Sequence, residues 1–239
     1  RAPHHTVSVQ ALTGGGRRPK PGEISLATGG ILFLDEFPEF SRAALETLRQ
    51  PLEEREVTVS RVEASVTYPA NFQLVAAMNP CPCGHFPDRS RCRCTDGQIT
   101  RYLQKVSGPM LDRIDICVEA APITYGDIKS SGNNESSREI RARVEQARKI
   151  QRERFAGENV RCNGEMSGRH IRKFCGLGRE EEKFMEEIFE KLALSARMHD
   201  RILKVARTTA DLAEEEKIRL ADLCEAVSYV KSRDKFWGN

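Results

Sequence analysis

The sequence predicts an α/β portion followed by an all-helical portion, and three observations support this division. Short, continuous apolar runs at 31–34 and 72–78 are typical of fully buried strands in a parallel sheet. A segment rich in Ser, Gly and Asn at 130–136 is typical of a flexible linker. Beyond this linker, apolar residues recur at the three- and four-residue spacing of amphipathic helices.

The α/β portion is expected to contain three strands, two hairpins and two helices. Ser41 can cap a helix in which Ala44 and Leu48 share one apolar face. Two β-rich segments on either side of Arg61 predict a hairpin that turns there. The expected elements are loops and a hairpin over 1–30, strands at 31–34, 72–78 and 114–118, a helix at 41–52, a hairpin of 57–60 with 64–68, and a helix near 98–106.

The helical portion begins with a capping-box signature, because Ser136 and Glu139 precede an apolar repeat. That repeat is Ile140, Val144, Ala147 and Ile150. Three more helices are expected at 179–191, at 195–212 and through 220–230. The sequence therefore predicts a partial α/β core over 1–128, a linker at 129–136 and a helical domain at 137–239.

Composition limits the classes of function. The formal net charge of +3 is too small to indicate a nucleic-acid-binding protein by itself, so such an interpretation depends on local basic clusters. No apolar stretch is long enough to span a bilayer, and the first residues lack the apolar region of a signal peptide. The cysteines are too sparse for a secreted disulfide scaffold, which favours a cytoplasmic protein with one local metal or redox cluster.

The strand expected at 31–34 ends in two adjacent carboxylates, Asp35 and Glu36. In parallel α/β sheets, ligands bind outside the carboxyl ends of the strands. There Asp35 can hold Mg²⁺ and Glu36 can polarise an attacking water, as the two acidic residues of a Walker B motif do. The alternative is a buried strand that runs into a solvated turn.

A polar residue, Asn79, follows the strand expected at 72–78. An asparagine in that place can orient the attacking water or contact the γ-phosphate of a nucleotide. The alternative is a turn formed by Asn79 and Pro80. The spacing after the two carboxylates, with one helix and one hairpin between, favours the site.

Arg113 stands immediately before the strand expected at 114–118. An arginine offered to the nucleotide of a neighbouring subunit can stabilise the charge on a transferring phosphoryl group. The alternative is a local ion pair with Asp112 and Asp115, which would contribute little at a surface.

Four cysteines crowd into one short loop that also contains Arg89, Arg91 and Arg93. Four thiolates in a short loop suit tetrahedral Zn²⁺, although their C-x-C spacing departs from the usual C-x-x-C and leaves His85 as an alternative ligand. Free thiols or a redox disulfide are the other interpretations. The basic side chains suit nucleic-acid phosphates or a solvated surface. The four candidate zinc ligands are Cys81, Cys83, Cys92 and Cys94.

The two carboxylates, the asparagine and the arginine, in this order, resemble the AAA+ ATPases. The segment 22–30, which leads into the first strand, resembles the segment before Walker B in one clade of these ATPases. That clade holds the magnesium-chelatase ATPase subunit and the MCM helicases. The segments 1–6 and 79–84 narrow the resemblance to the Mg-chelatase-like ATPases of the ComM/YifB group. The resemblance covers essentially the whole chain.

This resemblance implies a partial P-loop AAA+ sheet with a C-terminal helical lid, and ATP and Mg²⁺ as cofactors. It implies that Asp35 and Glu36 are the Walker B pair and that Asn79 is sensor 1. It also implies that Arg113 is the arginine finger and that Arg197 is sensor 2, which reaches the γ-phosphate in the same subunit. The alternative for Arg197 is a solvated arginine on an amphipathic helix.

In related ring motors, the segments corresponding to 7–20 and 57–68 point into a central pore. Positive charge on such loops would track a phosphate backbone without sequence readout. The resemblance therefore implies a homo-oligomer, a hexameric ring, that acts on DNA as relatives do in branch migration during natural transformation. The candidate DNA-contacting residues are Arg17, Arg18, Lys20 and Arg61.

One motif of the family is absent, because no G-x-x-x-x-G-K-[ST] occurs in the sequence. In the family this P-loop lies upstream of the first residue here, so the chain alone is expected not to hydrolyse ATP. Two other functions stay open: a chelatase ATPase subunit that drives metal insertion into a porphyrin, and a protein remodeller. The basic cysteine loop has no obvious role on a chelatase partner. No membrane and no small-molecule substrate other than ATP are expected.

Overall fold

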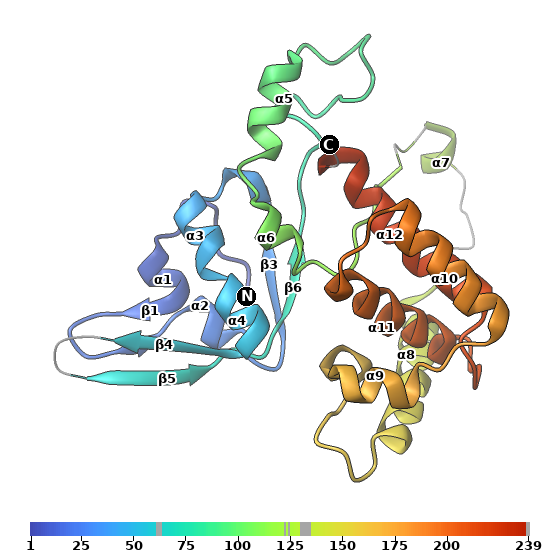
Figure 1. The fold of residues 1–239 in the computed structure, drawn as a ribbon. Coiled ribbons are helices and arrows are strands. Elements are labelled where there is room, and N and C mark those ends of the chain that lie inside the picture. The colour runs from blue at the N-terminus through green and yellow to red at the C-terminus, as the bar shows by residue number, and fades with distance from the viewer. Residues whose placement is uncertain (61–63, 122, 124, 130–134, 238–239) are drawn as a thin grey trace. The chain divides into compact units, whose positions relative to one another are not determined.

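The computed structural model describes residues 1–60, 64–121, 123, 125–129 and 135–237 (Figure 1). They form two compact units, Arg1–Ile114 with the last residues from Phe236, and Asp115–Lys235. The first unit mixes strands and helices and the second is helical, which confirms the predicted α/β-then-α class. Arg61 and most of the expected linker lie outside the described residues. No described helix combines the length and apolar character that crossing a membrane requires.

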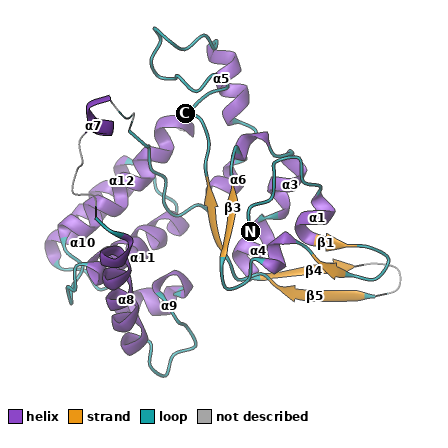
Figure 2. Cartoon of the chain, turned by 180° about the vertical axis from the view of Figure 1, so that it is seen from behind, coloured by secondary structure: helices purple, strands orange, loops and turns teal. Residues whose placement is uncertain are grey.

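Three two-stranded sheets lie in the first unit (Figure 2). The strands β1–β2 and β4–β5 are antiparallel pairs, whereas β3–β6 is parallel. The described elements of this unit are α1 (Val9–Thr13), β1 (Gly14–Gly15), β2 (Lys20–Pro21), α2 (Glu23–Leu26), β3 (Ile31–Leu34), the 3₁₀ turn η1 (Phe37–Glu39), α3 (Arg42–Thr47), α4 (Arg49–Glu54), β4 (Glu56–Ser60), β5 (Ser65–Pro69), β6 (Gln73–Ala76), α5 (Asp96–Leu103) and α6 (Gly108–Leu111).

The parallel pair β3–β6 is buried on one face only, so the prediction of two fully buried strands is wrong. Leu32 and Leu34 are completely buried, but Ile31 and Phe33 between them are 50% and 37% exposed. Val75 on β6 is 36% exposed. The side chains alternate because each strand residue points to the opposite face from its neighbour, and the core of this unit packs on one of the two faces.

The prediction of a third strand at 114–118 is also wrong. The described backbone has no regular structure there, and Ile116 and Val118 are exposed. A strand is stabilised by hydrogen bonds to a neighbouring strand, and β3 and β6 are the only members of their sheet among the described residues. The apolar alternation alone therefore did not decide the structure of this segment.

The first 30 residues contain two short helices, α1 and α2, where only loops and a hairpin were expected. Ser8 caps α1, because its hydroxyl accepts a hydrogen bond from the amide of Ala11 at 3.2 Å. Leu12 and Ile24 anchor the two helices in the core, and both are completely buried. Helices of this length show no repeat in the sequence and depend on such packing.

The hairpins β1–β2 and β4–β5 lie side by side (Figure 1). The hydroxyl of Tyr68 on β5 donates to the carbonyl of Pro19 at 2.9 Å. Gly14 has a φ of 107°, and a Cβ there would lie 2.3 Å from the carbonyl oxygen of Lys20, so only glycine fits. The predicted β4–β5 pairing is confirmed, with Thr58 and Thr67 hydroxyls 2.9 Å apart on its exposed face.

Ser41 caps a helix as predicted, through a 3.2 Å hydrogen bond from the amide of Ala44. The helix is divided, however, because α3 ends at Thr47 and α4 begins at Arg49. Pro51 in the first turn of α4 has no amide to donate to the carbonyl of Thr47, which explains the break.

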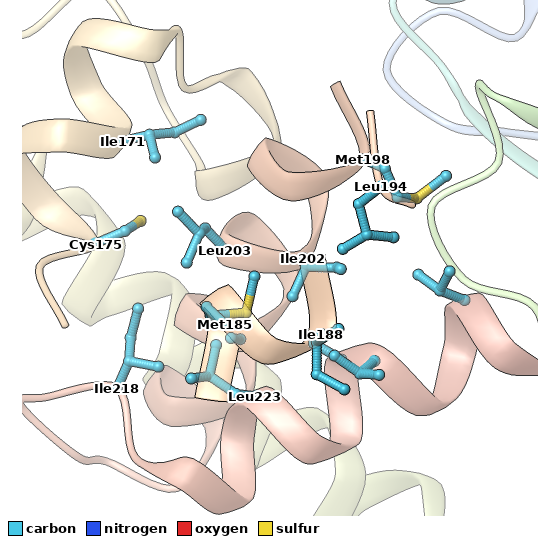
Figure 3. Close-up of a cluster of buried hydrophobic side chains, with 14 of the residues drawn as sticks. Ile171, Cys175, Met185, Ile188, Leu194, Met198, Ile202, Leu203, Ile218 and Leu223 are labelled. Carbon is cyan, nitrogen blue, oxygen red and sulfur yellow. The ribbon is translucent and has the colours of Figure 1, made fainter. Parts of the chain in front are cut away.

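The second unit is built around α11, which contacts α8, α9 and η2. Figure 3 shows apolar side chains from several helices meeting beside it, among them Ile202, Leu203 and Leu223. The predicted capping box is confirmed at Ser136 and Glu139. Its helices are α7 (Tyr125–Lys129), α8 (Ser137–Arg154), η2 (Asn163–Glu165), α9 (Gly168–Phe174), α10 (Arg179–Lys191), α11 (Ala196–Leu212) and α12 (Leu220–Trp237), whose last two residues belong to the first unit.

A buried ionic network also holds this unit together. The carboxylate of Asp211 is completely buried and pairs with the guanidinium groups of Arg154 and Arg207. Asn163 donates to the same carboxylate at 2.8 Å. Burial lowers the pKa of Arg207, and the charge of Asp211 opposes that shift. Asp211 thus joins α8, η2 and α11 through charge-assisted hydrogen bonds.

Candidate functional site

The carboxyl ends of β3 and β6 meet at one edge of the parallel pair. Leu34, the last residue of β3, is opposite Ala76, the last residue of β6. The amide of Ala77 donates to the carbonyl of Leu34, and the amide of Phe37 donates to the carbonyl of Ala77, both at 3.0 Å. Asp35, Glu36 and Asn79 therefore follow two neighbouring strands at the same edge, and all three side chains are exposed there.

Glu36 has a left-handed backbone with a φ of 52°, which is uncommon for a residue with a Cβ. Its amide donates to the Asp35 carboxylate at 2.9 Å. Its own carboxylate lies 2.9 Å from Nδ1 of His5. The strained backbone thus turns Glu36 toward a specific partner, which is typical of functional sites.

The position of His5 follows from the first residue of the chain. Arg1 bridges β3 as a parallel partner, because its amino group donates to Ile31 and its carbonyl accepts from Phe33, both at 2.8 Å. Arg1 therefore lies opposite Leu32. His5 follows Arg1 by four residues and Glu36 follows Leu32 by four residues, so the two side chains come close together. The sequence did not predict a role for His5. Of the N-terminal residues, only Arg1 pairs with β3, and a single paired residue produces no alternating strand pattern in the sequence.

The Asn79 backbone is held by α5, where Tyr102 makes a hydrogen bond to it. Tyr102 is buried, and this burial, with a smaller contribution from the charge of Glu39, raises its pKa to about 12. The hydroxyl therefore stays protonated at neutral pH. The predicted helix near 98–106 thus helps to position a candidate site residue.

Arg113 lies at the end of α6 with its side chain 15% exposed. Its Nε donates to the carbonyl of Arg49 at 3.1 Å, one terminal nitrogen donates to the carbonyl of Pro109 at 2.6 Å, and the other pairs with Glu53. Asp115, which the alternative interpretation paired with it, forms an ion pair with Arg201. In this structure Arg113 is thus bonded to residues of its own chain.

Arg197 is the second residue of α11, in its first turn and two positions after the capping residue Ser195. Its side chain is exposed. The next residue, Met198, is buried in the helical core and fixes the orientation of this turn. The helix therefore presents Arg197 at its N-terminal end, in the unit that does not contain Asp35.

Three of the four candidate DNA-contacting residues lie together. Arg17, Arg18 and Lys20 are exposed on the β1–β2 hairpin and the loop within it. The hydrogen bond from Tyr68 attaches this loop to the β4–β5 hairpin. The fourth candidate, Arg61, lies outside the described residues.

The four sulfur atoms of Cys81, Cys83, Cys92 and Cys94 lie within 4.8 Å of one another. His85, the alternative ligand, is not part of this group. The amide of His85 hydrogen-bonds to the sulfur of Cys83 and is the main reason that its pKa is lowered to about 6. Burial raises the pKa of Cys94 to about 11.

Comparison with known proteins gives two family matches and several relatives. The family described as "Magnesium chelatase, subunit ChlI" matches residues 1–128, and that described as "Magnesium chelatase, subunit ChlI C-terminal" matches residues 134–230. The chain is 48% identical over 230 residues to competence protein ComM of Haemophilus influenzae, which is 96% of this chain and 44% of that protein.

A protein named uncharacterized protein YifB, from Salmonella typhimurium, is 46% identical over 231 residues, which is 96% of this chain and 44% of that protein. The magnesium-chelatase 67 kDa subunit of Heliobacterium mobile is 28% identical over 144 residues, which is 59% of this chain and 20% of that protein. The chain therefore spans less than half the length of the relatives that it matches.

Proposed function

This chain belongs to the magnesium-chelatase-like family of AAA+ ATPases, and from that premise we propose that it is part of an ATP-driven ring motor that acts on DNA. The observation that carries the ATPase proposal is the shared sheet edge at which Asp35, Glu36 and Asn79 follow two paired parallel strands. Ligands of α/β sheets bind at such an edge.

The exposed carboxylate of Asp35 fits a magnesium site, because Mg²⁺ in nucleotide sites takes one or two carboxylates and the substrate phosphates. One of its oxygens accepts the amide of Glu36, which fixes the orientation of the carboxylate. Bound Mg²⁺ would neutralise charge on the phosphates of ATP. Glu36 would accept a proton from the attacking water, and Asn79 would orient that water.

In this proposal His5 is a positioning residue for Glu36. His5→Ala is expected to lower the turnover number for ATP in the full-length protein by about 10-fold and to leave the affinity for ATP unchanged, because a neighbouring hydrogen-bonding group fixes the orientation of a functional side chain. His170→Ala is the matched control, because His170 contacts Ser167 and Glu158 instead. Equal turnover in the two variants would remove His5 from the mechanism.

The DNA part of the proposal is supported by the exposed basic residues Arg17, Arg18 and Lys20 on one hairpin. Lysine and arginine bind phosphate groups without reading bases. The similarity to a competence protein supports the same assignment. A homo-oligomeric, hexameric ring would place one such hairpin from each subunit near a shared strand of DNA.

DNA is expected to stimulate ATP hydrolysis by the full-length protein, with Glu36→Gln as the inactive blank. Loss of a general base lowers rates by about 10²–10⁴-fold. The double variant Arg17→Gln with Arg18→Gln is expected to weaken DNA binding and to reduce the slope of its salt dependence by about 2. The measurements are steady-state ATP turnover with single-stranded DNA and binding titrations at several salt concentrations.

The matched control changes two exposed arginines of α8, Arg138→Gln with Arg141→Gln, which removes the same charge from another surface. Equal losses in both double variants would show a nonspecific effect of net charge and would exclude the hairpin as the contact. Turnover that DNA does not change would favour the second candidate, an ATPase subunit of a chelatase, which the match to the chelatase subunit supports. A protein remodeller would instead be stimulated by a protein substrate.

A further inference from the structure

We propose that Cys81, Cys83, Cys92 and Cys94 bind one zinc ion as a closed, structural site in the loop between β6 and α5 (Figure 1). This proposal concerns metal binding by the loop and does not depend on ATP hydrolysis or on DNA. It rests on the distances between the sulfur atoms, on the hydrogen bonds that orient them and on the absence of helices and strands from the described loop.

The distances between the sulfur atoms match a tetrahedral metal site. A zinc–sulfur bond of about 2.3 Å in a tetrahedron separates neighbouring sulfurs by about 3.8 Å. The sulfur of Cys81 lies 3.4 Å from that of Cys83 and 3.8 Å from that of Cys92, and the latter two are 3.6 Å apart. A disulfide needs about 2.05 Å between one pair, and no pair is near that value.

Two tight turns bring the C-x-C pairs together despite their unusual spacing. The amide of Gly84 donates to the carbonyl of Cys81 at 3.0 Å, and the amide of Cys92 donates to the carbonyl of Asp88 at 2.8 Å. The amide of Phe86 then donates to the sulfur of Cys81 at 3.4 Å. Such donors orient metal ligands and fix the site.

The basic side chain at the middle of the loop is used internally. Arg89 pairs with Asp96 at the start of α5, donates to the carbonyl of Cys94 at 3.2 Å and lies over the ring of Phe86. Arg89 thus links the cysteine loop to the start of α5.

A metal would cross-link a loop that contains no helix or strand. Between β6 and α5 the described chain has no helix or strand, and Cys81 and Cys92 are the only buried residues there. A structural zinc ion contributes folding free energy directly. Four sulfur ligands leave no open position, which is typical of structural and not of catalytic zinc.

The test is the metal content of the purified full-length protein, measured by elemental mass spectrometry. The wild type is expected to carry one zinc per chain more than the double variant Cys81→Ser with Cys92→Ser. The matched control, Cys162→Ser with Cys224→Ser, changes two cysteines outside the cluster and is expected to retain that zinc.

Because the cluster variant can misfold, a second measurement uses the unmodified protein. X-ray absorption at the zinc edge is expected to show four sulfur neighbours at about 2.3 Å. Exchange with Co²⁺ is expected to give the strong visible absorption of a tetrahedral thiolate site. Full reactivity of the four thiols without bound zinc, a disulfide in the loop, or iron in place of zinc would each overturn the proposal.

Discussion

Arg113→Ala is expected to lower ATP turnover by the full-length protein by about 10³-fold or more, which is the effect of removing an arginine finger. ATP binding is expected to change little, because the finger acts on the charge that develops in the transition state. The measurements are steady-state turnover and equilibrium binding of a nucleotide.

The contacts of Arg113 within its own chain make a simple loss of activity ambiguous. The guanidinium is bonded to the carbonyls of Arg49 and Pro109 and to Glu53, so the variant can also lose stability. Mixing subunits separates the two roles. In a ring, a subunit with Glu36→Gln still offers its Arg113 to a neighbour with Arg113→Ala, and this pair forms one complete site.

ATP hydrolysis is therefore expected to return when the two inactive variants are mixed. Each variant alone is expected to stay inactive. If the mixture stays inactive while both variants still assemble into rings, Arg113 stabilises its own subunit and does not act on a neighbour. The arginine finger would then have to be sought elsewhere.

Asp211→Asn is expected to destabilise the helical unit by about 3–5 kcal/mol, the usual cost of removing one partner from a buried ion pair. The substitution leaves the charges of Arg154 and Arg207 buried, with side chains only 14% and 3% exposed. The amide nitrogen of the new asparagine would also face the N–H donors of Arg154, Asn163 and Arg207, from which it cannot accept a hydrogen bond. The measurement is unfolding of the chain in urea, followed by the helical circular dichroism signal.

The matched control is Glu215→Gln, which removes a carboxylate that is 46% exposed and pairs with Arg219 at 2.8 Å. A surface pair contributes about 0–1 kcal/mol, so this variant should unfold close to the wild type. If both variants lose equally little, the network around Asp211 contributes no more than a surface pair and the helical unit is held by its apolar core.

The sequence predicted best where a pattern is local and repeated. The helices α10 and α11 match their predicted ranges to within one residue, because apolar spacing and capping residues lie within each segment. The carboxylates at the end of β3 were found because a strand followed by two acidic residues is a compact signal. The register of β3 and β6 shows that the residues following these two strands share one edge of the sheet.

The sequence predicted poorly where a structure depends on distant partners. The segment at 114–118 has the composition of a strand, but its conformation depends on whether another strand is beside it. Ile140 and Val144 fit the apolar repeat of α8, yet they are 43% and 41% exposed, because the packing of that helix begins further along. The pairing of His5 with Glu36 likewise depends on a bridge that spans 30 residues.

The hydrogen bond from Tyr68 to Pro19 couples the two hairpins of the first unit mechanically. The close backbone approach at Gly14 leaves little room for β1 and β2 to slide, and the hydroxyl of Tyr68 attaches their loop to β5. A force on the basic loop is thus shared with the β4–β5 hairpin. Because β2 continues through α2 into β3, the basic loop and the carboxylates that follow β3 are joined by one short stretch of chain.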